Sequence, residues 1–138
     1  MARRIEKRLE FAASPERVWK AISDPTEIAQ WFGDRAELDL RPGGEGCFIW
    51  DKHGHFAVRV EVVEPPHRLS WRWARKPNVA IDEGESTLVE WVLRERPGGG
   101  TVLELRESGF TEDKHLEDNT SGWDSELSEL SELLTRVS

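Results

Sequence analysis

Glu107 and Lys7 are the residues whose type and position best suit acid–base chemistry. Glu107 alternates with Leu103 and Leu105 in a run typical of a strand, so its carboxylate is predicted to share their apolar face. Lys7 shares a face with apolar residues in the strand expected at 3–12. Because a buried charge is costly unless it is paired, a carboxylate in such a position can orient a ligand or act as an acid or base. The alternative is a register slip or bulge that turns one or both side chains toward solvent.

The other reactive side chains carry weaker signals. Cys47, the only cysteine, lies in an expected strand beside Phe48 and lacks a basic neighbour, so it is predicted to be a small buried apolar residue. His53 and His55 flank Gly54 without a third ligand at a zinc-like spacing, so we expect solvated turn histidines and no metal. The glycine-rich stretches lack the Lys-Ser/Thr of a phosphate loop, and no cofactor is predicted.

Length and charge restrict the classes of protein. The chain has 138 residues, which predicts a single domain over 1–138. Acidic residues outnumber basic ones by 27 to 19, and a net charge of −8 would repel a phosphate backbone, so no nucleic-acid partner is expected. No run approaches the roughly 20 apolar residues of a membrane span, so we expect no membrane insertion and a cytoplasmic protein.

The elements that must position these residues follow the order β, α, α, about six β, α. Ser14 and Asp24 each precede a proline, which predicts the N-caps of two short consecutive helices. Short alternating runs separated by Pro- and Gly-rich turns predict antiparallel strands near 3–12, 45–51, 55–64, 67–74, 86–96 and 101–109.

Two periodic patterns define the expected apolar faces. Alternation in the strand at 55–64 places on one face Phe56, Val58, Val60 and Val62. Steps of four and three predict a final helix from about 120 to 137, which Leu116 could extend upstream, with the stripe Trp123, Leu127, Leu130, Leu134 and Val137. This helix must bury its stripe against the apolar face of the sheet, which predicts an α+β fold.

Aromatic usage is the unusual feature of the composition. The chain has seven Trp, five Phe and no Tyr, and so many large apolar rings must either form a dense core or line a hollow. We predict that they help to line a ligand cavity with one polar group, formed by Trp31, Phe32, Phe48, Phe56, Trp71, Trp73, Trp91, Leu105, Glu107, Phe110 and Trp123.

Several short motifs, in their order and spacing, resemble those of a known family. They are Ser14-Pro15-Glu16-Arg17-Val18-Trp19, Trp31-Phe32-Gly33, Pro42-Gly43-Gly44, Val62 to Leu69, Trp71-Arg72-Trp73, Gly99 to Leu103, Gly109-Phe110 and Gly122-Trp123. Over about residues 5–137 the chain resembles the domain related to the C-terminal part of the activator of heat-shock-protein-90 ATPase, in the START-like or SRPBCC superfamily. The resemblance implies a helix-grip fold, with a seven-stranded curved antiparallel sheet around the C-terminal helix and two short helices after the first strand. It also implies that the first and last strands are neighbours, which would bring Lys7 near Glu107.

The resemblance implies binding more directly than catalysis, since it carries no transferable catalytic motif. The leading prediction is a START-like domain that binds an apolar small molecule, such as a lipid, polyketide or aromatic compound. One alternative is a cyclase or hydrolase that uses Glu107, and another is a co-chaperone-like module with a chaperone partner. A homodimer is a further expectation, through an exposed face carrying Trp50 or Trp19.

Overall fold

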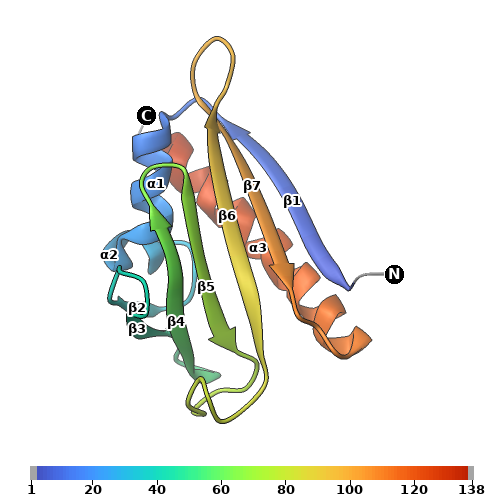
Figure 1. Ribbon diagram of the computed structural model, residues 1–138. Helices are drawn as coiled ribbons and strands as arrows, with labels where there is room; N and C mark the ends of the chain where they lie inside the picture. The colour runs from blue at the N-terminus through green and yellow to red at the C-terminus, as the bar shows by residue number, and fades with distance from the viewer. Residues whose placement is uncertain (1–2, 137–138) are drawn as a thin grey trace.

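A computed structural model describes residues 3–136 and shows an α+β fold in which a curved sheet faces one long helix (Figure 1). The elements in chain order are β1 (Arg4–Phe11), α1 (Pro15–Ser23), α2 (Pro25–Ile28), β2 (Arg35–Leu38), β3 (Glu45–Trp50), β4 (Gly54–Glu64), β5 (Arg68–Ala74), β6 (Ser86–Glu95), β7 (Thr101–Ser108) and α3 (Asp113–Arg136). The predicted order of elements is therefore confirmed.

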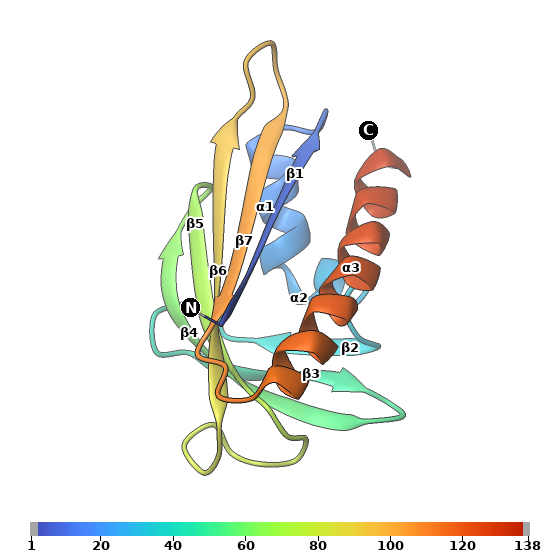
Figure 2. The ribbon, with the colours of Figure 1, turned by 90° about the vertical axis from the view of Figure 1, so that its right-hand side faces the viewer.

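The seven strands form one antiparallel sheet in the order β1-β7-β6-β5-β4-β3-β2. Strands β2 through β7 follow one another as a meander, with a longer loop over 75–85 between β5 and β6, and β1 forms the other edge by pairing with β7. Figure 2 shows the sheet curving so that β2 and β3 reach round toward α3. This is the helix-grip arrangement that the family resemblance implied.

The two short helices begin where the sequence predicts. The hydroxyl of Ser14 accepts a bond from the backbone N–H of Arg17 at 3.2 Å, and the carboxylate of Asp24 accepts one from the N–H of Thr26 at 2.9 Å. The turn after α2 ends at Gly33, whose φ of 77° lies in the left-handed region that glycine favours. This turn aims Phe32 into the space between sheet and helix.

α3 begins at Asp113, about seven residues before the start at 120 that its apolar stripe predicted. The stripe itself is confirmed where it is described, because Trp123, Leu127, Leu130 and Leu134 are all buried, while Val137 lies outside the described residues. The first turns of α3 carry few apolar residues because they cover a pocket and not the packed core. Within residues 3–136, no helix has both the length and the apolar character needed to cross a membrane.

A β-bulge in β4 corrects one predicted face. The register shifts between Val60 and Val62, so Val62 pairs with Ser70 and Val63 pairs with Leu69 on the core face. The prediction that Val62 points inward is therefore wrong, because the bulge adds one residue to the alternation.

Candidate ligand-binding pocket

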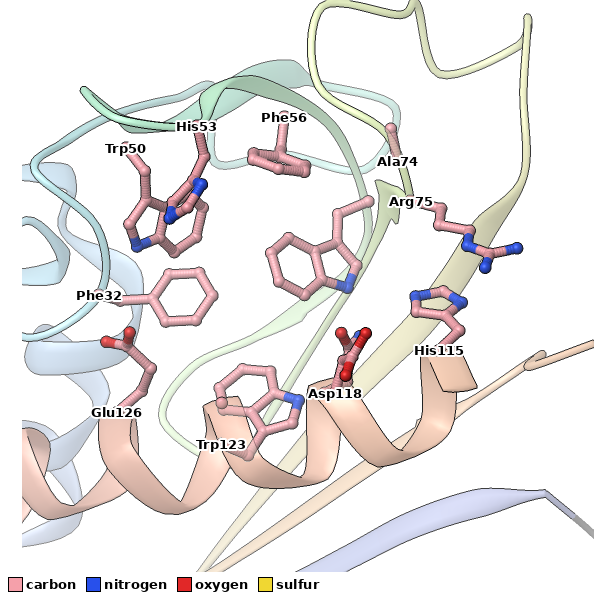
Figure 3. A pocket seen from close by; sticks show the side chains of 13 residues that line it. Phe32, Trp50, His53, Phe56, Ala74, Arg75, His115, Asp118, Trp123 and Glu126 are labelled. Carbon is pink, nitrogen blue, oxygen red and sulfur yellow. The ribbon is translucent and has the colours of Figure 1, made fainter. Parts of the chain in front are cut away.

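A pocket of about 650 Å³ opens between the ends of β3, β4 and β5 and the N-terminal half of α3 (Figure 3). Its size lies within the range typical of small-molecule sites. Each strand contributes a side chain from its inner face, and α3 contributes residues one turn apart. The pocket is lined by Phe32, Trp50, His53, Phe56, Trp73, Ala74, Arg75, His115, Asp118, Asn119, Gly122, Trp123 and Glu126.

Five aromatic rings form the apolar walls. Phe32 stacks on Trp123 with ring centroids 5.2 Å apart and planes at 16°. Trp50 and Phe56 pack edge to face with ring centroids 5.4 Å apart, and the ring centroids of Trp73 and Phe32 are 5.5 Å apart. Because each ring packs against others, the walls are held in place before any ligand arrives.

Glu107 lies behind the pocket lining and holds the rings of Trp73 and Trp123 in place. Its side chain is 0% exposed, and its Oε1 accepts a bond from Trp123 Nε1 at 2.7 Å. Its Oε2 accepts bonds from Trp73 Nε1 at 2.8 Å and from Thr87 Oγ1 at 2.5 Å. The amide of Asn119 donates to both oxygens, at 3.2 and 3.1 Å. Glu107 therefore joins β5, β6, β7 and α3 at one point.

This network limits what Glu107 can do chemically. A carboxylate offers about four acceptor positions, and donors from the protein already occupy both oxygens. Its predicted inward register is observed, yet the carboxylate lies behind the pocket wall and is not part of the lining. The arrangement suits the orientation of the wall residues better than proton transfer to a substrate.

Lys7 does not approach Glu107. In the β1–β7 ladder Lys7 lies opposite Leu105, while Glu107 lies opposite Ile5. The ammonium group of Lys7 instead forms an ion pair with Asp124 of α3 at 2.7 Å. The idea of a Lys7–Glu107 pair is therefore wrong, because the register offsets the two residues and α3 supplies another partner.

One end of the pocket carries charged side chains, and ion pairs within the protein balance their charges. Arg75 bonds to Glu85 at 2.6 Å and to Glu112 at 2.9 Å, and it lowers the pKa of each carboxyl group. Burial, with the charge of Arg75, lowers the pKa of His115 below its usual value, so this imidazole is neutral at pH 7. Asp118 pairs with Lys114 at 2.8 Å.

Glu126 differs from the other charged residues of the pocket. Among residues 3–136 its carboxyl group has no hydrogen bond or ion pair, and Figure 3 shows it on the same side of the pocket as Phe32. Partial burial is the main cause that raises its pKa to about 7, with smaller contributions from the charges of Glu129 and Asp34. At neutral pH this carboxyl group, at the surface of an aromatic pocket, is therefore near the midpoint between its protonated and ionised forms.

The structure divides the eleven predicted cavity residues into two groups. Four of them line the pocket: Phe32, Phe56, Trp73 and Trp123. The others are buried beneath it or elsewhere in the core: Trp31, Phe48, Trp71, Trp91, Leu105, Glu107 and Phe110. Trp31, for example, donates its N–H to the carbonyl of Ala21 at 2.8 Å, which fixes α2 against α1.

Trp50 is the main lining residue that the sequence analysis placed elsewhere. It was expected on an exposed face as a dimer contact, but it points into the pocket, two positions after the buried Phe48 on the same strand. That spacing was a usable signal, because residues two apart in a strand share a face. His53, Arg75, His115 and Asp118 carried no such signal, since they come from loops and from the polar start of α3, and Glu126 lies in the acidic middle of that helix.

The remaining reactive residues do not form a second site. Cys47 was predicted to be buried, but it lies half-exposed on the outer face of β3, and its Sγ is 3.8 Å from Glu37. Burial and the Glu37 carboxylate raise the pKa of this thiol, which disfavours the reactive thiolate. Within residues 3–136, no group of three His, Cys, Asp or Glu side chains is arranged to hold a metal ion.

Comparison with known proteins agrees with this architecture. CalU16 from Micromonospora echinospora is 31% identical, with a TM-score of 0.76, and the match covers 95% of this chain and 75% of that chain. DynU16, encoded in the dynemicin biosynthetic locus, is 24% identical with a TM-score of 0.83; the match covers 98% of this chain and 48% of DynU16, so this chain spans about half of its length. The Aha1 dimer from Colwellia psychrerythraea is 20% identical with a TM-score of 0.78, and the match covers 95% of each chain.

No curated protein sequence matches this chain significantly. The family described as activator of Hsp90 ATPase homolog 1-like protein matches residues 12–135, nearly the whole of the chain. That span includes the two capped helices, strands β2 to β7, all the pocket-lining residues and almost all of α3. This chain therefore belongs to the activator of Hsp90 ATPase homolog 1-like family, within the START-like proteins of helix-grip fold.

Proposed function

We propose that the protein binds an apolar small molecule, of lipid, polyketide or aromatic type, in the pocket between β3–β5 and α3. The observation that supports this most strongly is the set of five aromatic rings around an open volume of about 650 Å³. A protein interior is normally packed without voids of this size. An aromatic-walled opening is therefore better explained by an occupant than by folding alone.

The hydrogen bonds that hold the pocket walls in place favour binding over catalysis. The N–H groups of Trp73 and Trp123 are both fixed by Glu107, so the rings have one orientation. Preorganised walls reduce the entropy cost of binding. The cyclase or hydrolase alternative assigned the acid to Glu107, and this carboxylate is fully buried and already bonded to its own donors. A chaperone partner and a homodimer stay predictions.

Gly122 allows the pocket to be filled without damage to the fold. This residue lies on α3 in the pocket lining, and a Cβ built on it meets no atom within 4 Å. Gly122→Ala should stabilise the helix by about 1 kcal/mol, since glycine is a poor helix former. Gly122→Leu should extend an isobutyl group into the pocket and compete with any ligand.

The test is a binding assay by tryptophan fluorescence and calorimetry with phenylbutanol and a medium-chain fatty alcohol. We expect wild type to bind at least one of them, Gly122→Leu to lose about tenfold or more in affinity, and its melting temperature to stay at least as high. Ser128→Leu, at an exposed position of the same helix outside the pocket, is the matched control and should bind normally. Equal binding by wild type and Gly122→Leu would place the ligand elsewhere and reject the proposal.

A further inference from the structure

We infer that the ligand is an apolar molecule with a positively charged amine or quaternary ammonium group, and that Glu126 is the anionic partner of this group. The inference rests on the proposed function, since it assigns a ligand class to the same pocket. It depends on three features of the pocket: one carboxyl group without a partner, aromatic rings in the same lining, and no unpaired lysine or arginine among the described residues that line it.

Glu126 is the pocket acid that is left for a ligand. The other charged lining residues already have partners, because Arg75 is held by Glu85 and Glu112, and Asp118 by Lys114. The Glu126 carboxyl group lies partly buried on the pocket wall without a bond to any residue of 3–136. A ligand that donates to this carboxylate would recover an interaction that the free protein lacks.

The aromatic walls add a second reason for a cationic ligand. The pocket that holds this carboxylate is also lined by Phe32, Trp50, Phe56, Trp73 and Trp123, and Figure 3 shows Phe32 beside Glu126. Aromatic ring faces attract ammonium groups, and the attraction grows when the cation is removed from water. Rings with one neighbouring carboxylate therefore match an ammonium group attached to an apolar body.

The same charges disfavour an anionic ligand such as a fatty acid. The positive charge of Arg75 is already balanced by two carboxylates, and His115 is neutral at pH 7 because its pKa is lowered. The whole chain carries a net charge of −8, which attracts cations and repels anions at a distance.

Titration of Glu126 gives the inference a measurable signature. The groups that act on its carboxyl are Glu129 on its own helix and Asp34 in the turn that faces it, while His53 lines the same pocket. Its pKa of about 7 means that a fraction of molecules is protonated at neutral pH. Because a cation favours the ionised carboxylate, binding should release a proton near pH 7 and should strengthen as the pH rises through 7.

The first experiment compares three ligands with one carbon skeleton: phenylbutylamine, phenylbutanol and phenylbutanoate. At about pH 8 we expect the amine to bind roughly tenfold more tightly than the alcohol, and the carboxylate to bind most weakly. Glu126→Gln should remove most of this preference and leave only the part that the aromatic rings supply. Glu129→Gln, an exposed position on the same helix, removes one charge without touching the pocket and should keep the preference.

The second experiment measures protons directly. Benzyltrimethylammonium has no proton to lose, so any proton released on binding comes from the protein. Calorimetry in two buffers of different ionisation enthalpy should show release of about half a proton at pH near 7 in wild type and none in Glu126→Gln.

The outcomes separate this inference from the proposed function. If phenylbutanol binds and the amine has no advantage, or if the preference is undiminished in Glu126→Gln, the ammonium inference is wrong while the pocket still binds apolar molecules. If none of the three compounds binds to wild type, the proposed function fails and the inference fails with it.

Discussion

Two glutamates of the same region, Glu107 on β7 and Glu126 on α3, show how neighbours decide what a buried carboxylate does. Glu107 is fully buried and receives hydrogen bonds from Trp73, Thr87, Asn119 and Trp123. Glu126 is only partly buried and has no such donor among residues 3–136, so its ionised form is disfavoured and its pKa rises to about 7. The more deeply buried acid is the better compensated one.

This difference indicates a division of labour around the pocket. A buried charge is tolerated when donors replace the lost water, and those donors are then fixed in place. Glu107 therefore orients two of the five aromatic walls from behind. A carboxyl group that lacks donors is available to a ligand, and Glu126 has this character on the pocket surface.

The largest effect is expected for Glu107→Gln. The amide –NH2 would face donors and leave at least one of them without an acceptor, so the free energy of unfolding should fall by about 3 kcal/mol. Urea denaturation at pH near 7 measures this loss. Glu104→Gln is the matched control on the outer face of β7, where Glu104 pairs with Arg94, and it should cost less than about 1 kcal/mol. Equal losses in the two variants would remove the structural role assigned to Glu107.

A smaller effect is expected for Thr87→Val, which keeps the shape of a buried side chain and removes one donor to Glu107. The variant should lose about 1–2 kcal/mol of stability, with only a small loss of ligand affinity because Thr87 does not line the pocket. Trp73→Phe removes a donor and also reshapes the pocket wall, so it should lower both the stability and the ligand affinity. The comparison would fail if Thr87→Val weakened binding as strongly as Trp73→Phe.

Most of the fold was predictable from the sequence because its signals are local. Ser14 and Asp24 start the two short helices, and alternation correctly assigned Leu103, Leu105 and Glu107 of β7 to the inner face. The bulge at Val60–Val62 was not predictable from alternation, since an extra residue leaves no mark in the pattern of apolar residues.

The site was less predictable than the fold. An inward face shows that a residue is buried, but not whether it meets packed atoms or open space. Trp71 and Trp73 share a strand face, yet Trp71 lies in the core and Trp73 lines the pocket. Glu126 could not be singled out for a different reason. A glutamate in an acidic helix is normally solvated, and only the fold places the turn that carries Phe32 beside it.

The smallest effect, and the most direct test of the contrast, is the pH dependence of Glu126→Gln. In wild type the folded pKa of about 7 lies above the ordinary value of 4.5, so the proton stabilises the fold below pH 4.5 and this stabilisation is lost as the pH rises through 7. Glutamine cannot lose a proton, so the variant should match wild type at low pH and exceed it above pH 7. Because the side chain is partly exposed, solvent screening reduces the gain to about 1 kcal/mol. Unfolding by urea across this pH range measures the gain, with Glu132→Gln, an exposed position on the same helix, as the control. A flat difference between wild type and Glu126→Gln would mean that Glu126 is solvated like Glu129, and the contrast with Glu107 would then reduce to depth of burial alone.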